Sequence, residues 1–361
     1  MVAREDVLKA LERIVDPASG RSVVDSGMVE GLVVKGGNVG FALEVAPSRG
    51  RDAEPLRKRC EDAVAALPGV LSVTAVLTAH QGKAPDAPRA APPPQPSGIA
   101  GVDSIVAVAS GKGGVGKSTV SVNLAIGLAR LGLKVGLLDA DIYGPSVPRL
   151  LAIREKPDQG ADHKLVPIEK FGIKTMSIGF LVEEETPMIW RGPMVQSALT
   201  QMMNDVLWSP LDVLVVDMPP GTGDAQLTMA QRVPLKGAVI VSTPQDLALI
   251  DARKAIAMFE KTKVPILGIV ENMSTYVCPN CGHESHIFGH GGARRTAKAM
   301  GAAFLGEIPL VGSIREMSDA GTPVTAIAPE SAEAKAYFTL AEEVARSLKA
   351  PLRAAPRIVL E

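Results

Sequence analysis

A glycine-rich turn between an apolar run and the start of a helix constrains this chain more than any other stretch. Residues 104–119 read SIVAVASGKGGVGKST, and the apolar run at their start is typical of a buried parallel strand. Glycines let backbone N–H groups surround phosphate oxygens at the N-terminus of the following helix. The spacing of Gly111, Gly116, Lys117 and Ser118 fits the P-loop pattern. A plain glycine turn is the structural alternative, but Lys-Ser-Thr in register with the helix favours a nucleotide site.

Each position of this loop has an expected partner on a bound nucleotide. Lys117 is placed to reach the β- and γ-phosphates, and the Ser118 hydroxyl is placed to bind Mg²⁺. The whole turn is therefore expected to contact the nucleotide, at Gly111, Lys112, Gly113, Gly114, Val115, Gly116, Lys117, Ser118 and Thr119.

A second lysine inside the loop, Lys112, distinguishes the motif KGGVGKS from an ordinary P-loop. The motif resembles that of the deviant P-loop ATPases, a group that includes the nitrogenase iron protein and the ParA- and MinD-type ATPases. The resemblance implies that the nucleotide is ATP and that Lys112 reaches the phosphates held by the other subunit of a dimer. The alternative, a solvated loop lysine, leaves a charge beside a triphosphate without a function. We therefore expect Lys112 and Lys117 to act in catalysis.

Acidic residues follow two apolar segments that read as buried strands. Asp139 and Asp141 come after the apolar segment at 134–138, and Asp217 follows the segment at 211–216. Ligands of open α/β sheets bind beyond the carboxyl ends of the strands. An apolar strand that ends in aspartate is the Walker B arrangement, so Asp217 is expected on or near Mg²⁺. Alone, a strand-end aspartate more often caps the next turn.

The resemblance to the deviant P-loop ATPases assigns further roles at this edge. It implies that Asp141 orients or activates the attacking water and that Asp139 supports the Mg²⁺ coordination. The segment GTGD at 221–224 resembles a switch loop that senses the γ-phosphate. Asn272, which follows the apolar segment at 266–270, is expected by resemblance to contact the adenine. As an isolated residue it would more often be a turn former.

Cys278 and Cys281 form a CxxC motif, which is redox-active, metal-binding or merely part of a turn in different proteins. Thiolates suit zinc and iron–sulfur clusters, but a closed tetrahedral site needs four ligands. His283 and His286 offer a Cys₂His₂ zinc site, although the spacing is far shorter than a zinc-finger span. A two-fold dimer supplies four thiolates instead, because it brings two identical pairs together. Cys60, on the expected core face of a helix, is interpreted as a structural thiol.

Three segments together carry a more specific resemblance. DADIYGPSVP (139–148), DMPPGTGD (217–224) and ENMSTYVCPNCGHESHIFG (271–289) resemble the Mrp-type iron–sulfur cluster carriers. The resemblance implies a homodimeric ATPase that holds a [4Fe–4S] cluster between its subunits on the CxxC pairs, hydrolyses ATP slowly and passes the cluster on. Apo iron–sulfur proteins and a cluster-assembly scaffold are the implied partners.

Residues 1–80 read as a separate small domain. Apolar spacing predicts a helix, a hairpin, a second helix and a third strand, in an αββαβ order. This order, together with Asp16-Pro17 and the GMVEGL segment at 27–32, resembles the MIP18-type domain of iron–sulfur assembly factors. The stretch APSRGRD at 46–52 lacks the cysteine that members of that family often carry.

Shifts in composition and periodicity predict the remaining boundaries. The segment 81–99 is rich in proline and alanine and has no apolar periodicity, which predicts a semi-extended linker. Alternating strands and helices over 100–350 predict a P-loop NTPase with a mostly parallel sheet covered by helices on both faces, hence an α/β fold. Residues 351–361 are expected to form a tail. Acidic residues in the helix expected at 331–349 favour docking on the core over membrane binding.

The composition argues against several classes of function. A net charge of −1 gives no global field for nucleic acid or anionic membranes, and 3% aromatic residues leave few platforms for stacking bases. No apolar run reaches the length of a membrane span, and the charged, amphipathic start does not resemble a secretory signal. Three cysteines make no disulfide framework. We therefore expect a cytoplasmic protein without nucleic-acid or membrane partners.

Two rival interpretations remain open. A nucleotide-switched positioning ATPase of the MinD or ParA kind would have no metal, and it would use a membrane or DNA surface. The sequence shows neither the basic helix nor the basic patch that this interpretation requires. A zinc-bound scaffold that uses the same cysteines differs from the cluster carrier only in its metal.

Overall fold

Two compact units make up the chain, Met1–Pro93 and Pro94–Glu361. The computed structural model describes residues 2–35, 37–45, 53–78, 98–160, 164–182 and 192–349. The APSRGRD stretch, most of the predicted linker and the predicted tail lie outside the described residues.

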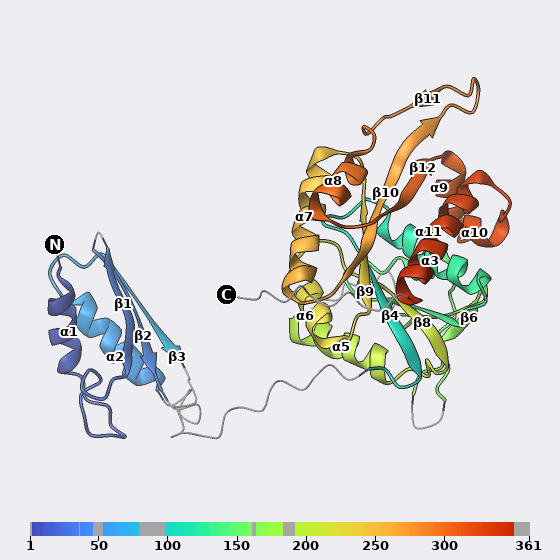
Figure 1. Cartoon of the computed structure of the whole chain (residues 1–361). Helices are drawn as coiled ribbons and strands as arrows, with labels where there is room; N and C mark the ends of the chain where they lie inside the picture. The colour runs from blue at the N-terminus through green and yellow to red at the C-terminus, as the bar shows by residue number, and fades with distance from the viewer. Residues whose placement is uncertain are drawn as a thin grey trace, which may run out of the picture. The chain divides into compact units, whose positions relative to one another are not determined.

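The N-terminal unit is a three-stranded sheet with two helices packed on it (Figure 1). Its elements are α1 (Arg4–Glu12), β1 (Val29–Lys35), β2 (Asn38–Glu44), α2 (Glu54–Ala65) and β3 (Ser72–Thr78). The strands β1 and β2 pair antiparallel as the predicted hairpin, and β3 joins β2 in parallel. Alternate residues of β2 are buried, and Phe41 and Leu43 share one core with Val7 of α1 and Cys60 of α2. The αββαβ order is confirmed.

The second unit is built on a nine-stranded sheet in the order β11-β10-β9-β4-β8-β5-β7-β6, with β12 also paired to β10. The strands are β4 (Val102–Ala109), β5 (Val135–Asp139), β6 (Ile168–Lys170), β7 (Ile173–Ser177), β8 (Leu211–Asp217), β9 (Gly237–Ser242), β10 (Ile266–Val277), β11 (Glu284–Ser285) and β12 (Phe304–Leu310). All pairings among β7, β5, β8, β4, β9, β10 and β12 are parallel. The short strands β6 and β11 are antiparallel to their neighbours β7 and β10. The mostly parallel sheet is confirmed.

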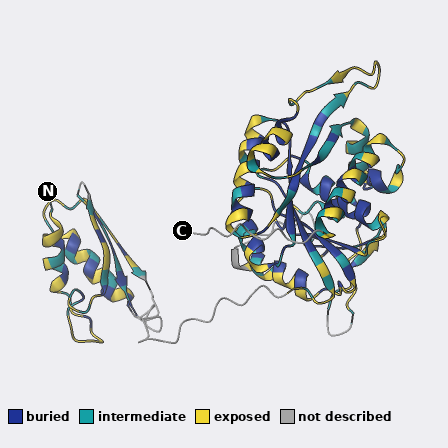
Figure 2. Cartoon of the chain, in the orientation of Figure 1, coloured by how far each residue is buried: buried dark blue, intermediate teal, exposed yellow. Residues whose placement is uncertain are grey.

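Helices cover both faces of this sheet (Figure 1). They are α3 (Lys117–Arg130), α4 (Val147–Leu150), the 3₁₀ turn η3 (Ile178–Phe180), α5 (Gly192–Asn204), α6 (Asp224–Arg232), α7 (Asp246–Lys261), α8 (Gly292–Met300), α9 (Gly312–Asp319), α10 (Val324–Ile327) and α11 (Ala332–Lys349). The central strands between the two layers are buried along most of their length, as Figure 2 shows. Strands covered on both faces need apolar side chains on both, which explains their continuous apolar runs.

The last helix, α11, packs on the core as its composition predicts. Leu340, Ala341 and Val344 are buried in the main core of the unit. The helix lies directly on α3, where a side chain at Gly127 would place its Cβ 2.9 Å from the Ala341 Cβ. The small residue is therefore required for the close approach of the two helices.

The strand β10 is longer than the sequence analysis predicted. A strand at 266–270 was expected, but β10 continues to Val277, so that Asn272 lies inside the strand and Cys278 follows its end. The extension exists because β12 pairs with β10 up to Tyr276, and β11 pairs with Tyr276 and Val277. The polar residues in this stretch give no apolar run that would predict a strand. Their buried side chains form specific contacts only in the folded protein.

Candidate functional site

The predicted site residues of the P-loop and the two acidic strand ends meet at one edge of the sheet. Asp139 ends β5 and Asp217 ends β8, and the two residues are direct neighbours in the parallel register. Asp217 also pairs with Val108 of β4, after which the P-loop begins. The carboxyl ends of three adjacent strands therefore surround the N-terminus of α3, as expected for an α/β ligand site.

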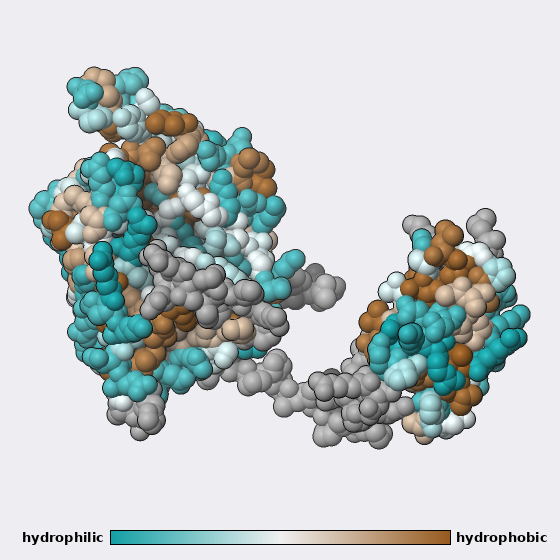
Figure 3. All heavy atoms as spheres, turned by 180° about the vertical axis from the view of Figure 1, so that it is seen from behind, coloured by the Kyte–Doolittle hydropathy of each residue, from teal (hydrophilic) through white to brown (hydrophobic). Residues whose placement is uncertain are grey.

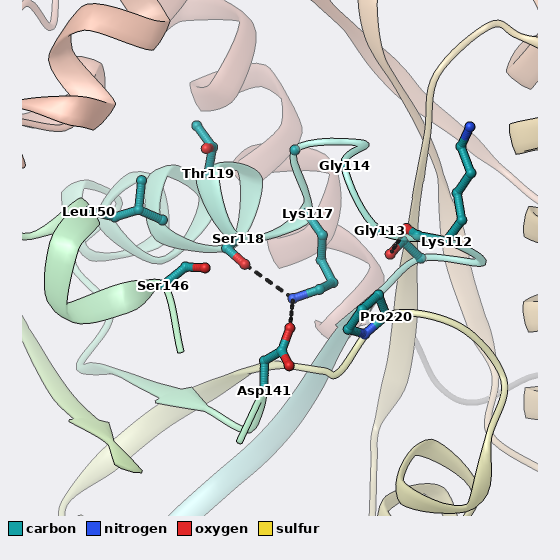
Figure 4. A pocket seen from close by; sticks show the side chains of 12 residues that line it. Lys112, Gly113, Gly114, Lys117, Ser118, Thr119, Asp141, Ser146, Leu150 and Pro220 are labelled. Carbon is teal, nitrogen blue, oxygen red and sulfur yellow. Dashed lines mark hydrogen bonds and ion pairs between the residues drawn. The ribbon is translucent and has the colours of Figure 1, made fainter. Parts of the chain in front are cut away.

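A cavity of about 270 Å³ lies at this edge (Figure 4). The predicted residues that line it are Lys112, Gly113, Gly114, Gly116, Lys117, Ser118, Thr119 and Asp141. Gly111, Val115, Asp139, Asp217 and Asn272 are not among its lining residues. These five residues lie next to the lining residues, as the contacts described below show.

Lys117 forms a buried ion pair with the Walker B aspartate. Its Nζ lies 2.7 Å from Asp217 Oδ1, and it donates a second hydrogen bond to Ser118 Oγ at 3.1 Å. Asp141 Oδ2 lies 3.9 Å from the same ammonium group. The Lys117 side chain is only 6% exposed and that of Asp217 is 0% exposed, so the pair is screened little by water. The lysine that is expected to bind phosphate is thus held beside the residues expected to bind Mg²⁺.

Asp217 has one carboxylate oxygen left for a further ligand. Its Oδ1 accepts from Lys117 and from Ser121 Oγ, the latter at 2.7 Å. Its Oδ2 is buried and has no hydrogen-bond partner among the described residues. A buried carboxylate oxygen without a partner costs free energy, which a cation or a water bound to it would recover. With the Ser118 hydroxyl nearby, this hard oxygen donor set fits Mg²⁺.

Asp139 holds the loop that carries Asp141. Its Oδ1 accepts from the backbone N–H of Asp141 at 3.1 Å, and its Oδ2 accepts from the N–H of Val147 at 3.1 Å and from Ser177 Oγ at 3.0 Å. Burial and the neighbouring Asp217 carboxylate raise the pKa of Asp139. These contacts position the loop between β5 and α4. Support of Mg²⁺ by Asp139 stays a prediction.

Asp141 is the acidic residue that faces the cavity. Burial raises the pKa of its carboxyl, and the Lys117 ammonium opposes this rise. A carboxylate with a raised pKa is a better proton acceptor than a solvated one. This environment fits a group that orients and activates water.

Asn272 touches the P-loop. Its Nδ2 donates to the Val115 carbonyl oxygen at 2.8 Å, although 157 residues separate the two in the chain. Gly116 has a φ of +80°, and a Cβ at this position would collide with the Asn272 amide. The contact of Asn272 with adenine stays a prediction.

The second lysine of the loop, Lys112, behaves differently from Lys117. Figure 4 shows its side chain extending away from the Lys117 ammonium. The neighbouring Gly111 lies so close to α7 that a Cβ would overlap the backbone of Asp251. The loop is therefore pressed against α7 at Gly111 and turns Lys112 outward.

The sequence analysis missed four residues that line the cavity, namely Ser110, Ser146, Leu150 and Pro220. Ser146 and Pro220 stand in the segments DADIYGPSVP and DMPPGTGD, so their position in those segments was an available signal. Leu150 is one apolar residue of a short helix, and no local pattern distinguishes it from a core leucine.

Cys278 and Cys281 lie at the far end of the β10–β11 hairpin. The hairpin projects from the body of the unit in Figure 1 and forms a mostly hydrophilic knob in Figure 3. The Cys278 N–H donates to the His283 carbonyl at 3.0 Å, and the Gly282 N–H donates to the Cys278 carbonyl at 2.9 Å. These bonds close a tight turn that places both thiols near the surface, with Cys278 half-buried and Cys281 exposed.

The environment of Cys278 favours its thiolate. Hydrogen bonds from the backbone of Cys281 and Asn280 lower the pKa of Cys278, and the Cys281 thiol adds to this effect. The thiolate is the form that binds metal. Burial raises the pKa of Cys60 to about 11, which fits the structural thiol expected in the N-terminal core.

Within the described part of the chain, one group of side chains has metal-ligand spacing, Glu271, His290 and Glu307, and it contains neither cysteine. The two histidines of the zinc alternative, His283 and His286, are thus not grouped with the thiols at ligand distance. The hairpin presents two sulfur donors side by side.

Comparisons with known proteins agree with this architecture. The family of the NUBPL iron-transfer P-loop NTPase matches residues 101–345, and an iron–sulfur cluster assembly protein family matches residues 4–76. No helix among the described residues is both long and apolar enough to cross a bilayer.

Individual relatives extend over most of the second unit. The Arabidopsis thaliana iron–sulfur protein required for NADH dehydrogenase is 59% identical over 69% of this chain and 80% of its own length. The Escherichia coli (strain K12) iron–sulfur cluster carrier protein is 55% identical over 70% of this chain and 68% of its own. The Archaeoglobus fulgidus nucleotide-binding protein, solved with ADP, is 41% identical with a TM-score of 0.57, covering 66% of this chain and 92% of its own. The N-terminal unit is similar to the iron–sulfur cluster assembly protein family, and the chain belongs to the family of the NUBPL iron-transfer P-loop NTPase.

Proposed function

We propose that this protein is an ATP-hydrolysing carrier that holds an iron–sulfur cluster between two copies of the chain and transfers it to apo-proteins. The observation that carries the proposal is the cysteine hairpin, where half-buried Cys278, whose pKa is lowered by hydrogen bonds, and exposed Cys281 follow the end of β10. The similarity to the Escherichia coli cluster carrier protein supports cluster transfer as the task of this hairpin.

The number of sulfur donors supports the homodimer. Iron–sulfur clusters are commonly held by four cysteine thiolates, and the hairpin of one chain offers Cys278 and Cys281. A two-fold axis near the hairpin brings the same two residues from the second copy, which completes four ligands. A [4Fe–4S] cluster is the cargo we propose for this shared site.

The cavity supports binding and hydrolysis of ATP. The backbone N–H groups from Gly113 to Lys117 surround the phosphates, and Ser118 with Asp217 would hold Mg²⁺, which neutralises charge on the phosphates when bound. Asp141 orients the water that attacks the γ-phosphorus and accepts its proton as the bond to ADP breaks. We propose that Lys112, whose side chain extends away from the Lys117 ammonium, acts on the phosphates of the second copy.

The partners we propose are apo iron–sulfur proteins and a cluster-assembly scaffold. The family of the N-terminal unit supports a role in cluster assembly for that unit. A positioning ATPase without metal is less well supported, because it gives the cysteine hairpin no task. The cytoplasmic location stays a prediction.

Cluster transfer can be measured directly. Full-length protein is reconstituted with iron and sulfide under anaerobic conditions, freed of excess reagent and mixed with an apo iron–sulfur enzyme. We expect the carrier's visible absorbance to fall as the acceptor gains activity, faster than with free iron and sulfide at equal concentration. An acceptor that regains activity no faster than with the free ions would contradict transfer, and reconstituted protein that contains zinc alone would contradict the cargo.

A further inference from the structure

The strand β10 joins the two functional sites of the second unit. Asn272 contacts the P-loop, and Cys278 follows six residues later at the end of the same strand. At the rise of a regular strand, about 3.3 Å per residue, this segment would span at most roughly 20 Å. In Figure 1, β10 runs from the body of the second unit out to the hairpin. One continuous element thus reaches from the nucleotide cavity to the thiols.

The contact at Asn272 fixes one peptide plane of the P-loop. In a trans peptide, the carbonyl of Val115 and the N–H of Gly116 lie in one plane and point in opposite directions. The Asn272 amide holds the carbonyl at 2.8 Å from behind, which turns the Gly116 N–H the other way. Gly116 lines the cavity, where this N–H is available to phosphate oxygens. Asn272 is 6% exposed, so its hydrogen bond competes little with water.

The segment between Asn272 and the cysteines is irregular. Met273 has a φ of +58°, a left-handed conformation that costs a non-glycine residue free energy. The register with β12 shifts between Asn272 and Tyr276. Ser274 Oγ lies 3.0 Å from a Glu271 oxygen and 3.1 Å from a Glu307 oxygen, and one hydroxyl proton satisfies only one of them at a time. This stretch therefore departs from the geometry of a regular strand.

We propose that Asn272 is a positioning residue that aims the Val115–Gly116 peptide at bound phosphates and, through β10, makes the reactivity of Cys278 and Cys281 depend on nucleotide. A bound phosphate accepts a hydrogen bond from the Gly116 N–H and reorients the Val115–Gly116 peptide. This reorientation changes the hydrogen bond between the Val115 carbonyl and the Asn272 amide. The strained turn at Met273 passes this change to the hairpin. The inference rests on nucleotide binding at the P-loop, as proposed above, but not on the identity of the cargo.

The test measures thiol alkylation in the full-length, cluster-free protein. Magnesium tripolyphosphate serves as the ligand, because it lacks the adenine that Asn272 is also expected to contact. Iodoacetamide labelling of Cys278 and Cys281 is followed by peptide mass spectrometry at one pH, with and without saturating ligand. In the wild type we expect the labelling rate to change by at least about threefold, which corresponds to a modest coupling between sites.

Two variants separate the steps of the proposal. Asn272→Ala should weaken tripolyphosphate binding about tenfold, since the Gly116 N–H is no longer oriented to donate a hydrogen bond to the charged phosphate. At saturation, the ratio of the labelling rates with and without ligand should be one. Met273→Gly, which suits a positive φ, should keep the affinity but lose the ratio.

Thr175→Val in β7 is the matched control, because it removes the hydrogen bond from a buried hydroxyl to the Ile168 carbonyl, near the sheet edge opposite β10, and should behave as the wild type. Buried Cys60 reports only on the N-terminal unit, so the unfolding temperature of each variant is measured to check that the second unit is folded.

The outcomes distinguish this inference from the proposed function. Wild-type protein that binds neither tripolyphosphate nor ATP overturns both. Wild-type protein that binds the ligand with no change in labelling overturns the coupling alone, as does an Asn272→Ala variant with wild-type affinity and wild-type ratio. Cluster uptake is measured separately and is not affected by any of these results.

Discussion

Cys278→Ser should lose the ability to take up an iron–sulfur cluster. Serine has no sulfur and its hydroxyl is not ionised near neutral pH, so each chain would contribute one sulfur donor and a pair of chains only two. Even the loss of a hydrogen bond that supports a ligand costs about 10–100-fold in metal affinity. Removal of the ligand itself should therefore lower iron and sulfide content after anaerobic reconstitution by at least about tenfold. Cys281→Ser should do the same.

The control for this prediction is the third cysteine. Cys60 lies in the core of the N-terminal unit, and burial raises its pKa to about 11, so it is a poor ligand. Cys60→Ala should retain wild-type iron and sulfide content per folded chain. Equal uptake by Cys278→Ser and the wild type would show that the hairpin is not the cluster site.

Lys117→Met should both weaken nucleotide binding and destabilise the nucleotide-free protein. A hydrogen bond to a charged phosphate contributes about 1.5–3 kcal/mol, so the affinity for ATP should fall about 10–100-fold. In the free protein, the change leaves the Asp217 carboxylate buried without its cation. Breaking one side of a buried ion pair costs about 3–5 kcal/mol, which lowers the unfolding temperature by roughly 10 °C.

Two further variants check the physical reason. Lys112→Met alters a lysine of the same loop that extends away from the buried pair, so the unfolding temperature should stay within about 2 °C of the wild type. Lys117→Met combined with Asp217→Leu replaces both charges and should recover most of the stability while ATP binding stays weak. Calorimetry of unfolding and of ATP binding measures both quantities. A single Lys117→Met variant as stable as the wild type would contradict the role of the pair.

Sequence patterns predicted the fold well where short-range interactions determine the structure. The strand–turn–helix around Lys117 and the apolar strands that end in Asp139 and Asp217 follow from short-range periodicity and from the glycine requirement of the loop. The parallel sheet then follows from strand–helix alternation, since parallel strands need a crossover connection. The N-terminal hairpin was equally visible, because its alternation and glycine turn are both local.

Long-range contacts decided what the sequence could not predict. The full length of β10 depends on β12 and β11, which pair with residues too polar to read as a buried strand. The resting position of Lys117 depends on Asp217, 100 residues away. The contact between Asn272 and Val115 likewise joins segments whose proximity no short-range pattern reveals. These partners explain why buried polar residues were harder to interpret than the apolar core.

The most direct test of the central claim is the mass of the cluster-loaded protein. Anaerobic native mass spectrometry of reconstituted wild-type protein, combined with iron and sulfide determination, gives the number of chains per cluster. Because one hairpin supplies two thiolates, the account predicts a species of two chains that share one cluster. A single chain that carries a complete cluster would contradict it.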